Sequence, residues 1–215
     1  MICALVAFHA SAQKSDVDQV LQSRYKSPTK SIVIDVEAKL DAAILWDLQQ
    51  RLSKTFWQTV QINPGFSMSF DHVEKLGDRK YMMADLMAAY ERIRVLAPAV
   101  HHVLLVDGET YTPGRSRNYS LSRNDPLKGS VGVISVGVLM LPPYVTQEFA
   151  TRRLTERLYK SIKKRLITMY GYQPAAPDCL LRFFRSVAFI DELPNDVCPA
   201  DRKILQAEGI LRPGM

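Results

Sequence analysis

The feature that most constrains the fold is a run of four apolar residues, Val103–Val106, which lies between segments with helical periodicity. A strand that is apolar on both faces is typical of the centre of a sheet covered by helices. A second apolar run, at 131–139, predicts another such strand. Because strands alternate with helices along the chain, we predict an α/β fold with a mixed, mainly parallel twisted sheet flanked by helices.

The other elements follow from periodicity and turn signals. Apolar residues at helical spacing predict helices at 39–54, 78–97 and 142–171, and β-branched runs predict strands at 31–36 and 56–62. The polar stretch 115–130 is expected to hold an edge strand. The region 174–215 is expected to be mainly loop, with a short helix at 202–208.

The 215 residues suit one domain, and no linker divides the chain. Residues 31–215 are therefore expected to form a single domain, after a leader of residues 1–30. Ile2–Phe8 is apolar and Ala10-Ser11-Ala12 resembles a signal-peptidase site, although no basic residue precedes it. If residues 1–12 are a signal remnant, the protein is secreted or periplasmic, and otherwise it is cytoplasmic. No apolar run is long enough to span a membrane.

The net charge of +6 is concentrated in one predicted helix. Seven basic residues oppose only Glu148 and Glu156 between positions 144 and 172; they are Arg152, Arg153, Arg157, Lys160, Lys163, Lys164 and Arg165. The ordinary interpretation is a solvated helix face. An alternative is an anion-binding or nucleic-acid-binding surface at 152–165, which no accompanying RNA-binding or zinc-finger motif supports.

Three segments occur in the order found in the archaemetzincin zinc peptidases. The first runs from Val103 to Gly114 and holds Asp107, Tyr111 and Pro113, and the second is the strand Val133–Leu139. The third joins Cys179-Leu-Leu-Arg-Phe-Phe-Arg-Ser186 to Cys198-Pro-Ala-Asp201. From about 31 to 206 the chain resembles this family, and the resemblance implies a single zincin-like domain with a substrate cleft beside the edge strand. It places Asp107, Glu109, Tyr111 and Ser135 in that cleft.

The resemblance also implies where the catalytic zinc motif HExxHxxGxxH should lie. Gly171 matches its glycine, and the zinc-binding and catalytic positions are then Lys164, Arg165, Thr168 and Pro174. None is a metal ligand or a carboxylate base. A shift of one residue gives Lys163, Lys164, Ile167 and Gln173, which is no better.

The other residues do not rebuild a metal site. The histidines are His9, His72, His101 and His102, and no two of them are four residues apart. The family's structural zinc site is implied at Cys179 and Cys198, with Asp201 in place of its last cysteine. Two thiolates and a carboxylate do not complete a tetrahedral zinc site. The resemblance therefore predicts a Cys179–Cys198 disulfide in an oxidising compartment, and neighbouring thiols otherwise.

These observations predict an archaemetzincin-like protein that has lost the catalytic zinc site, uses no cofactor, and binds a peptide or protein segment. One alternative is an active metallopeptidase or other hydrolase with a non-standard site. The other is the anion-binding module on the basic helix. The sequence does not determine the oligomeric state or name a partner.

Overall fold

The computed structural model describes residues 31–78, 80–94, 100–114, 119–125, 129–172, 180–181 and 186–213. Its centre is a five-stranded sheet in the order β2-β1-β4-β7-β6. The strands are β1 (Ser31–Val36), β2 (Val60–Pro64), β4 (Val100–Val106), β6 (Ser120–Asp125) and β7 (Gly129–Ser135). Only β6 runs antiparallel to its neighbour, so the predicted mixed, mainly parallel sheet is confirmed.

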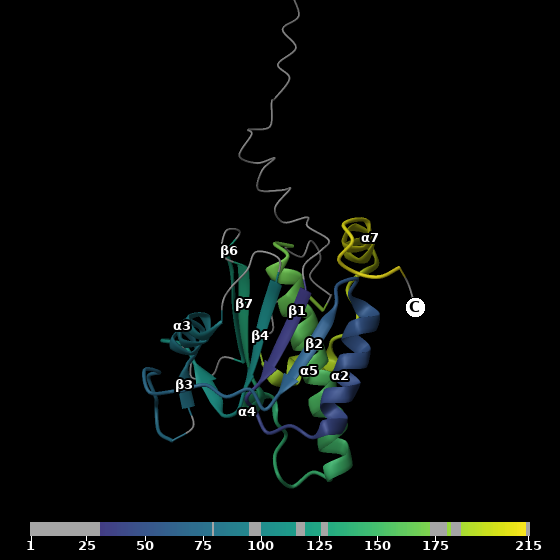
Figure 1. Ribbon diagram of the computed structural model, residues 1–215. Helices are drawn as coiled ribbons and strands as arrows, with labels where there is room; N and C mark the ends of the chain where they lie inside the picture. The colour runs from purple at the N-terminus through teal and green to yellow at the C-terminus, as the bar shows by residue number, and fades with distance from the viewer. Residues whose placement is uncertain are drawn as a thin grey trace, which may run out of the picture.

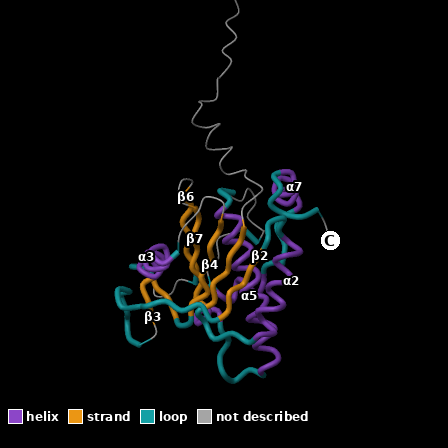
Figure 2. Tube along the Cα trace, in the orientation of Figure 1, coloured by secondary structure: helices purple, strands orange, loops and turns teal. Residues whose placement is uncertain are grey.

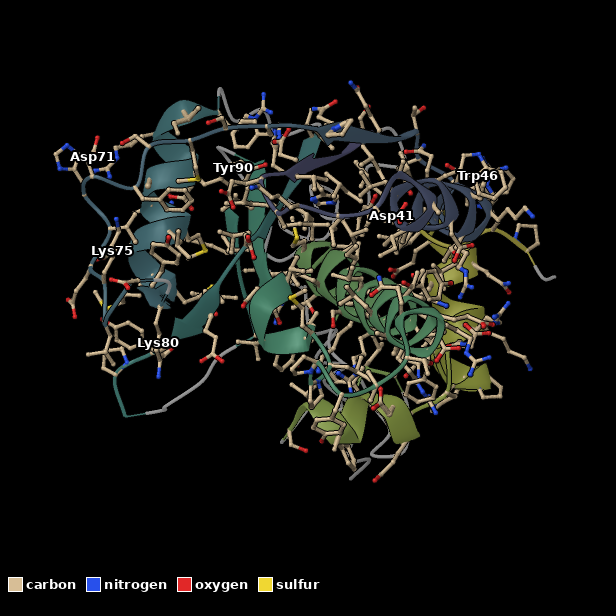
Figure 3. All side chains as sticks on the ribbon, turned by 90° about the horizontal axis from the view of Figure 1, so that it is seen from below. Asp41, Trp46, Asp71, Lys75, Lys80 and Tyr90 are labelled. Carbon is tan, nitrogen blue, oxygen red and sulfur yellow. The ribbon has the colours of Figure 1, made fainter. Side chains whose placement is uncertain are left out.

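Helices cover both faces of this sheet (Figures 1 and 2). One face packs against α2 (Ala42–Thr55) and the long helix α5 (Gln147–Met169), and the other lies under α3 (Met83–Ile93). The fully buried Leu48, Leu158 and Leu166 belong to the larger core under α2 and α5. Tyr90 and Leu104 belong to the smaller core under α3. Figure 3 shows Tyr90 within the molecule and Trp46 on its outer surface.

The helix ends follow from the sequence. Asp41 caps α2 by accepting a 2.9 Å hydrogen bond from the Ala43 amide, and Thr146 caps α5 through Phe149. Helix α5 ends before Gly171, whose φ of 81° lies in the left-handed region that glycine adopts readily. The apolar stripe on α5 is buried; it consists of Leu154, Leu158, Ile162, Leu166 and Met169.

Two expectations need correction. The apolar run 131–139 is not all strand, because Ser135 accepts a hydrogen bond from the Val138 amide and starts the short helix α4 (Val136–Leu139). Gly137 then lies against the turn after β4, and a Cβ there would meet the Gly108 carbonyl oxygen at 2.4 Å. The C-terminal region also has more helix than expected: α6 (Val187–Glu192) precedes α7 (Pro199–Ala207).

A small second sheet lies beside the main one. It pairs β3 (Lys80–Met82) with β5 (Glu109–Tyr111), so α3 begins later than the periodicity indicated. On β4, His101 and His102 point to opposite faces, as adjacent strand residues must. The His101 ring packs edge-on against Tyr170, at 4.2 Å between centroids.

Candidate functional site

The last two turns of α5 carry the positions where the resemblance placed the catalytic zinc motif. Lys164, Arg165 and Thr168 lie there, and the left-handed Gly171 follows at the spacing that the motif requires. Pro174 lies outside the described residues. Because the helix ends where this register needs it to end, the positions of the three described residues can be judged directly.

Arg165 points from α5 to the edge strand β6. Its guanidinium donates to Ser122 Oγ at 3.1 Å, to the Ser120 carbonyl oxygen at 3.2 Å and to Ser120 Oγ at 2.5 Å. Its Nε is buried and has no hydrogen-bond partner among the described residues. Burial lowers the pKa of Arg165, yet a guanidinium stays protonated in proteins. A permanent positive charge therefore spans the space between α5 and β6.

Glycine on β7 makes this arrangement possible. A Cβ at Gly132 would lie 3.1 Å from Arg165 Cγ and 3.4 Å from Met169 Sδ. The aliphatic part of Arg165 thus lies flat against the backbone of β7 before its head group reaches β6. A larger residue at 132 would displace the arginine.

Lys164 and Thr168 complete the three described positions. Burial, together with the neighbouring charge of Arg165, lowers the pKa of Lys164 to about 7. Thr168 is exposed and donates its hydroxyl proton to the Lys164 carbonyl oxygen at 3.0 Å. This end of α5 therefore carries one fixed cation and one that titrates near neutral pH.

This donor set does not suit zinc. Arginine has no lone pair to offer, lysine offers one only when deprotonated, and the threonine hydroxyl is committed to its own helix. Structural and catalytic zinc sites use imidazole, thiolate and carboxylate groups. Within the described part of the chain, no three His, Cys, Asp or Glu side chains lie close enough to hold a metal ion. The residues at the expected zinc site therefore do not fit the ion.

Three more basic residues of α5 contact α6 and the segment that follows it, and all three are buried. Arg157 forms a bidentate pair with Asp191, at 2.9 and 2.7 Å, and donates to the Leu139 carbonyl oxygen at 2.8 Å. Lys160 donates to the carbonyl oxygens of Ile190 and Leu193, at 2.9 and 2.5 Å.

The third of these residues, Lys163, donates to Asp196 Oδ1 at 2.8 Å and to the Asn195 carbonyl oxygen at 3.2 Å. Arg157, Lys160 and Lys163 thus fasten the segment 190–196 to the helix. The interpretation of 152–165 as one solvated basic face is therefore wrong for these three residues, and a broad anion-binding face loses them too.

The cysteine region is described only in part. Cys3 and Cys179 lie outside the described residues, so the Cys179–Cys198 disulfide stays a prediction. Asp201 is buried in the first turn of α7 and accepts a 2.7 Å hydrogen bond from Tyr172. Burial and this bond raise the pKa of Tyr172 to about 12. Asp201 thus ties α7 to the residue after Gly171.

The residues expected in the substrate cleft lie at two places. Asp107 and Ser135 lie at the carboxyl ends of adjacent strands, where Ser135 is fully buried and donates to the Gly108 carbonyl oxygen at 2.7 Å. Glu109 and Tyr111 lie on β5 in the small sheet, and Tyr111 donates to Glu74 at 2.6 Å. That bond raises the pKa of Tyr111 to about 12.

Ser120, Ser122 and Gly132, which hold Arg165, were not recognised from the sequence. Two serines on a polar edge strand and a glycine in an apolar strand are common features. Nothing in the sequence marks them, because only the folded chain brings them to the C-terminal end of α5.

No protein-family model and no curated protein matches the sequence. Solved structures do. A zinc-dependent peptidase from Methanocorpusculum labreanum aligns with a TM-score of 0.65 at 15% identity, over 81% of this chain and 100% of that one. The archaemetzincin from Archaeoglobus fulgidus, crystallised with malonate, aligns with a TM-score of 0.61 at 18% identity, over 80% and 98% of the two chains.

The archaemetzincin from Methanopyrus kandleri gives a TM-score of 0.57 at 16% identity, over 85% and 96% of the two chains. The chain has the archaemetzincin fold. At these identities the likeness extends to the fold alone, so the chemistry of the archaemetzincin-fold chain has to be argued from its own residues. In the described residues, no helix is long and apolar enough to cross a membrane.

Proposed function

We propose that this archaemetzincin-fold protein is not a zinc peptidase and that it binds a peptide or protein segment beside β6. The feature that carries the proposal is Arg165, which the resemblance assigns to the position of the family's general base and which extends to β6. A carboxylate there would accept a proton from zinc-bound water. A guanidinium cannot accept that proton, and it repels a divalent cation.

Peptide binding is supported by the geometry of the edge strand. Ser135 donates its backbone amide to the Tyr119 carbonyl oxygen, and the Ser120–Ile134 register continues from that bond. In an antiparallel pair, alternate residues bond to the neighbour and the others face away. Ser120 and Ser122 therefore turn their backbone groups away from β7. Extended peptides commonly add to such an edge by main-chain hydrogen bonds.

The charges beside this edge favour an acidic ligand. Arg165 already occupies the outward carbonyl oxygen of Ser120, which limits how far a peptide can pair along β6. The guanidinium of Arg165, held at this end of β6 by Ser120 and Ser122, favours a carboxylate nearby. A peptide with a free C-terminal carboxylate, or with an acidic side chain at that point, fits this arrangement.

Elemental analysis and a peptidase assay test the loss of zinc chemistry. We expect the purified protein to contain no stoichiometric zinc and to leave unstructured peptides intact with or without added zinc. One tightly held zinc per chain together with chelator-sensitive cleavage would overturn this part of the proposal and favour a non-standard peptidase site.

A pair of variants at one residue tests edge binding. Ser122→Pro removes an outward N–H and leaves the bonds to β7 intact, since proline is tolerated on edge strands. Ser122→Ala keeps the N–H and loses only the hydroxyl. With fluorescent acidic peptides, we expect Ser122→Pro to weaken binding about tenfold, the value of one hydrogen bond, and Ser122→Ala to have less effect. Equal effects of both variants, or no binding by the wild type, would argue against strand addition.

A further inference from the structure

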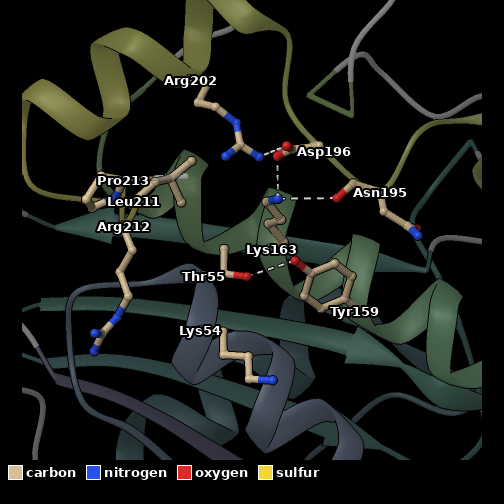
Figure 4. Close-up of a pocket in the computed structure, with 10 residues that line it drawn as sticks. All are labelled: Lys54, Thr55, Tyr159, Lys163, Asn195, Asp196, Arg202, Leu211, Arg212 and Pro213. Atoms are coloured by element: carbon tan, nitrogen blue, oxygen red, sulfur yellow. Dashed lines mark hydrogen bonds and ion pairs between the residues drawn. The ribbon is translucent and has the colours of Figure 1, made fainter. Parts of the chain in front are cut away.

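A cavity of about 200 Å³ lies far along the chain from the edge strand, between the end of α2, the middle of α5 and the C-terminal segment (Figure 4). Thr55 and Tyr159 form part of its wall and share a 2.8 Å hydrogen bond. Typical small-molecule pockets have volumes of roughly 300–1,000 Å³. The cavity is therefore suited to a compact ligand.

The charges that line the cavity are mostly positive. Four of its lining residues are basic and one is acidic; the basic residues are Lys54, Lys163, Arg202 and Arg212, and the acidic residue is Asp196. A cleft lined by charges of one sign concentrates the potential and attracts ions of the opposite sign. The ligand that matches this lining is an anion.

Asp196 is shared by two of these cations. It accepts from the buried Lys163 at 2.8 Å and also pairs with Arg202. One carboxylate cannot neutralise two cations, so the interior of the cavity retains positive charge. Burial also lowers the pKa of Lys163, because removing the ammonium group from water disfavours its charged form.

Donors remain for a ligand at the mouth of the cavity. Lys54 is exposed and forms no hydrogen bond or ion pair within the described residues. Arg202 uses one nitrogen for Asp196. Arg212 is held in place because its Nε donates to the Phe56 carbonyl oxygen at 2.8 Å and its guanidinium lies over the Trp57 ring. A lysine and two arginines among the lining residues give the cavity a positive potential that favours an anion with several oxygens.

The cavity is separate from the edge-strand site. Lys163 and Arg165 are two residues apart on α5, which places them on different sides of the helix. Lys163 contacts the segment 195–196, whereas Arg165 contacts β6. Binding at one place therefore leaves the side chains of the other untouched.

We propose that this cavity binds a compact oxyanion, either inorganic phosphate or the phosphate group of an organic ester. The tetrahedral anion would lie among the basic residues that line the cavity, where the flexible Lys54 side chain could turn toward it, and would compensate the excess charge around Asp196. Charge-assisted bonds of this kind are the strong ones among hydrogen bonds.

Calorimetric titration with inorganic phosphate and with glycerol phosphate, in chloride buffer at constant ionic strength, tests the proposal. We expect saturable binding to one site. Stronger binding of the ester would identify an organic phosphate as the preferred source, and stronger binding of inorganic phosphate would identify the free ion. If neither probe saturates the protein by about 10 mM, which corresponds to a binding free energy weaker than roughly 3 kcal/mol, the proposal is wrong.

The matched variants are Lys54→Glu and Lys203→Glu. Both residues are exposed, so both variants are expected to fold, and Lys203 lies next to Arg202 on α7 without lining the cavity. Lys54→Glu should weaken phosphate binding at least about tenfold, and Lys203→Glu less than about threefold, because solvent screens exposed charges at a distance. Equal weakening by both would mean that phosphate responds to net charge alone, and the proposal would be wrong.

Discussion

Replacing Asp191 with alanine removes the carboxylate that neutralises Arg157. The Arg157 side chain is 11% exposed and that of Asp191 is 26% exposed, so the pair lies between the buried and the surface cases. Breaking a buried pair costs about 3–5 kcal/mol and losing an exposed one costs about 0–1 kcal/mol. Since Arg157 keeps its bond to the Leu139 carbonyl oxygen, we expect Asp191→Ala to lower the free energy of unfolding by about 2–3 kcal/mol.

Urea unfolding measures this loss, and a thermal scan should show a fall of about 5–10 °C for a domain of this size. The control is Glu192→Ala, which removes the neighbouring, exposed carboxylate of α6 and should cost less than about 0.5 kcal/mol. If the two variants lose equal stability, the Arg157–Asp191 pair does not hold the segment 190–196 to α5, and the reasoning is refuted.

Acid titration gives an independent check on the same pair. Burial raises the pKa of Asp191. The hydrogen bond and charge of Arg157, with the charges of Arg153 and Lys160, together lower this pKa by more, so it lies below its usual value. A lowered carboxylate pKa stabilises the fold above the unfolded pKa and is lost as the pH falls through the folded value. The stability difference between wild type and Asp191→Ala should therefore be constant above about pH 5 and shrink below about pH 4.

Two further predictions concern Lys164 and the cysteines. Lys164→Met should raise the free energy of unfolding by about 1–2 kcal/mol at pH 6, after solvent screening is allowed for, and by less at pH 9. The reason is that the folded protein holds the Lys164 proton only up to about pH 7, whereas the unfolded chain holds it to about pH 10.4; a pH-independent difference in urea unfolding would contradict this. Mass spectrometry of unreduced, alkylated peptides should show Cys179 joined to Cys198 in protein made in an oxidising compartment, and Cys198→Ser should then cost about 3 kcal/mol for a loop of roughly 20 residues; alkylation of both cysteines in that material would exclude the bond.

The sheet and its main helices could be predicted because each is encoded locally. The apolar run 103–106 and the stripe on α5 bury the residues that their periodicity indicates. The burial and the partners of Arg157, Lys160 and Lys163 could not be predicted in this way. Their partners are Asp191, Asp196 and backbone carbonyl groups about 30 residues further on, and only the folded chain brings these to α5.

The candidate site also has features that the sequence predicts and features that it does not. The lack of zinc ligands at Lys164, Arg165 and Thr168 can be read from the sequence once Gly171 is matched to the glycine of the motif. The position of the Arg165 head group is not, because it depends on the empty space above Gly132 and on two serine hydroxyls from another strand. Helix α4 was missed because valine favours strands, and the cap from Ser135 overrides that preference.

The hydrogen bonds from Arg165 to Ser120 and Ser122 also affect how copies of this protein behave in concentrated solution. An open sheet edge is a template on which a second, identical edge can pair, and such pairing leads to aggregation. Two copies that joined through β6 would bring two guanidinium groups together, each fixed by its serines and unable to turn away. Like charges held close together repel, the more so where little water separates them. The arginine that we propose attracts an acidic segment would therefore also disfavour pairing of β6 with the β6 of a second copy.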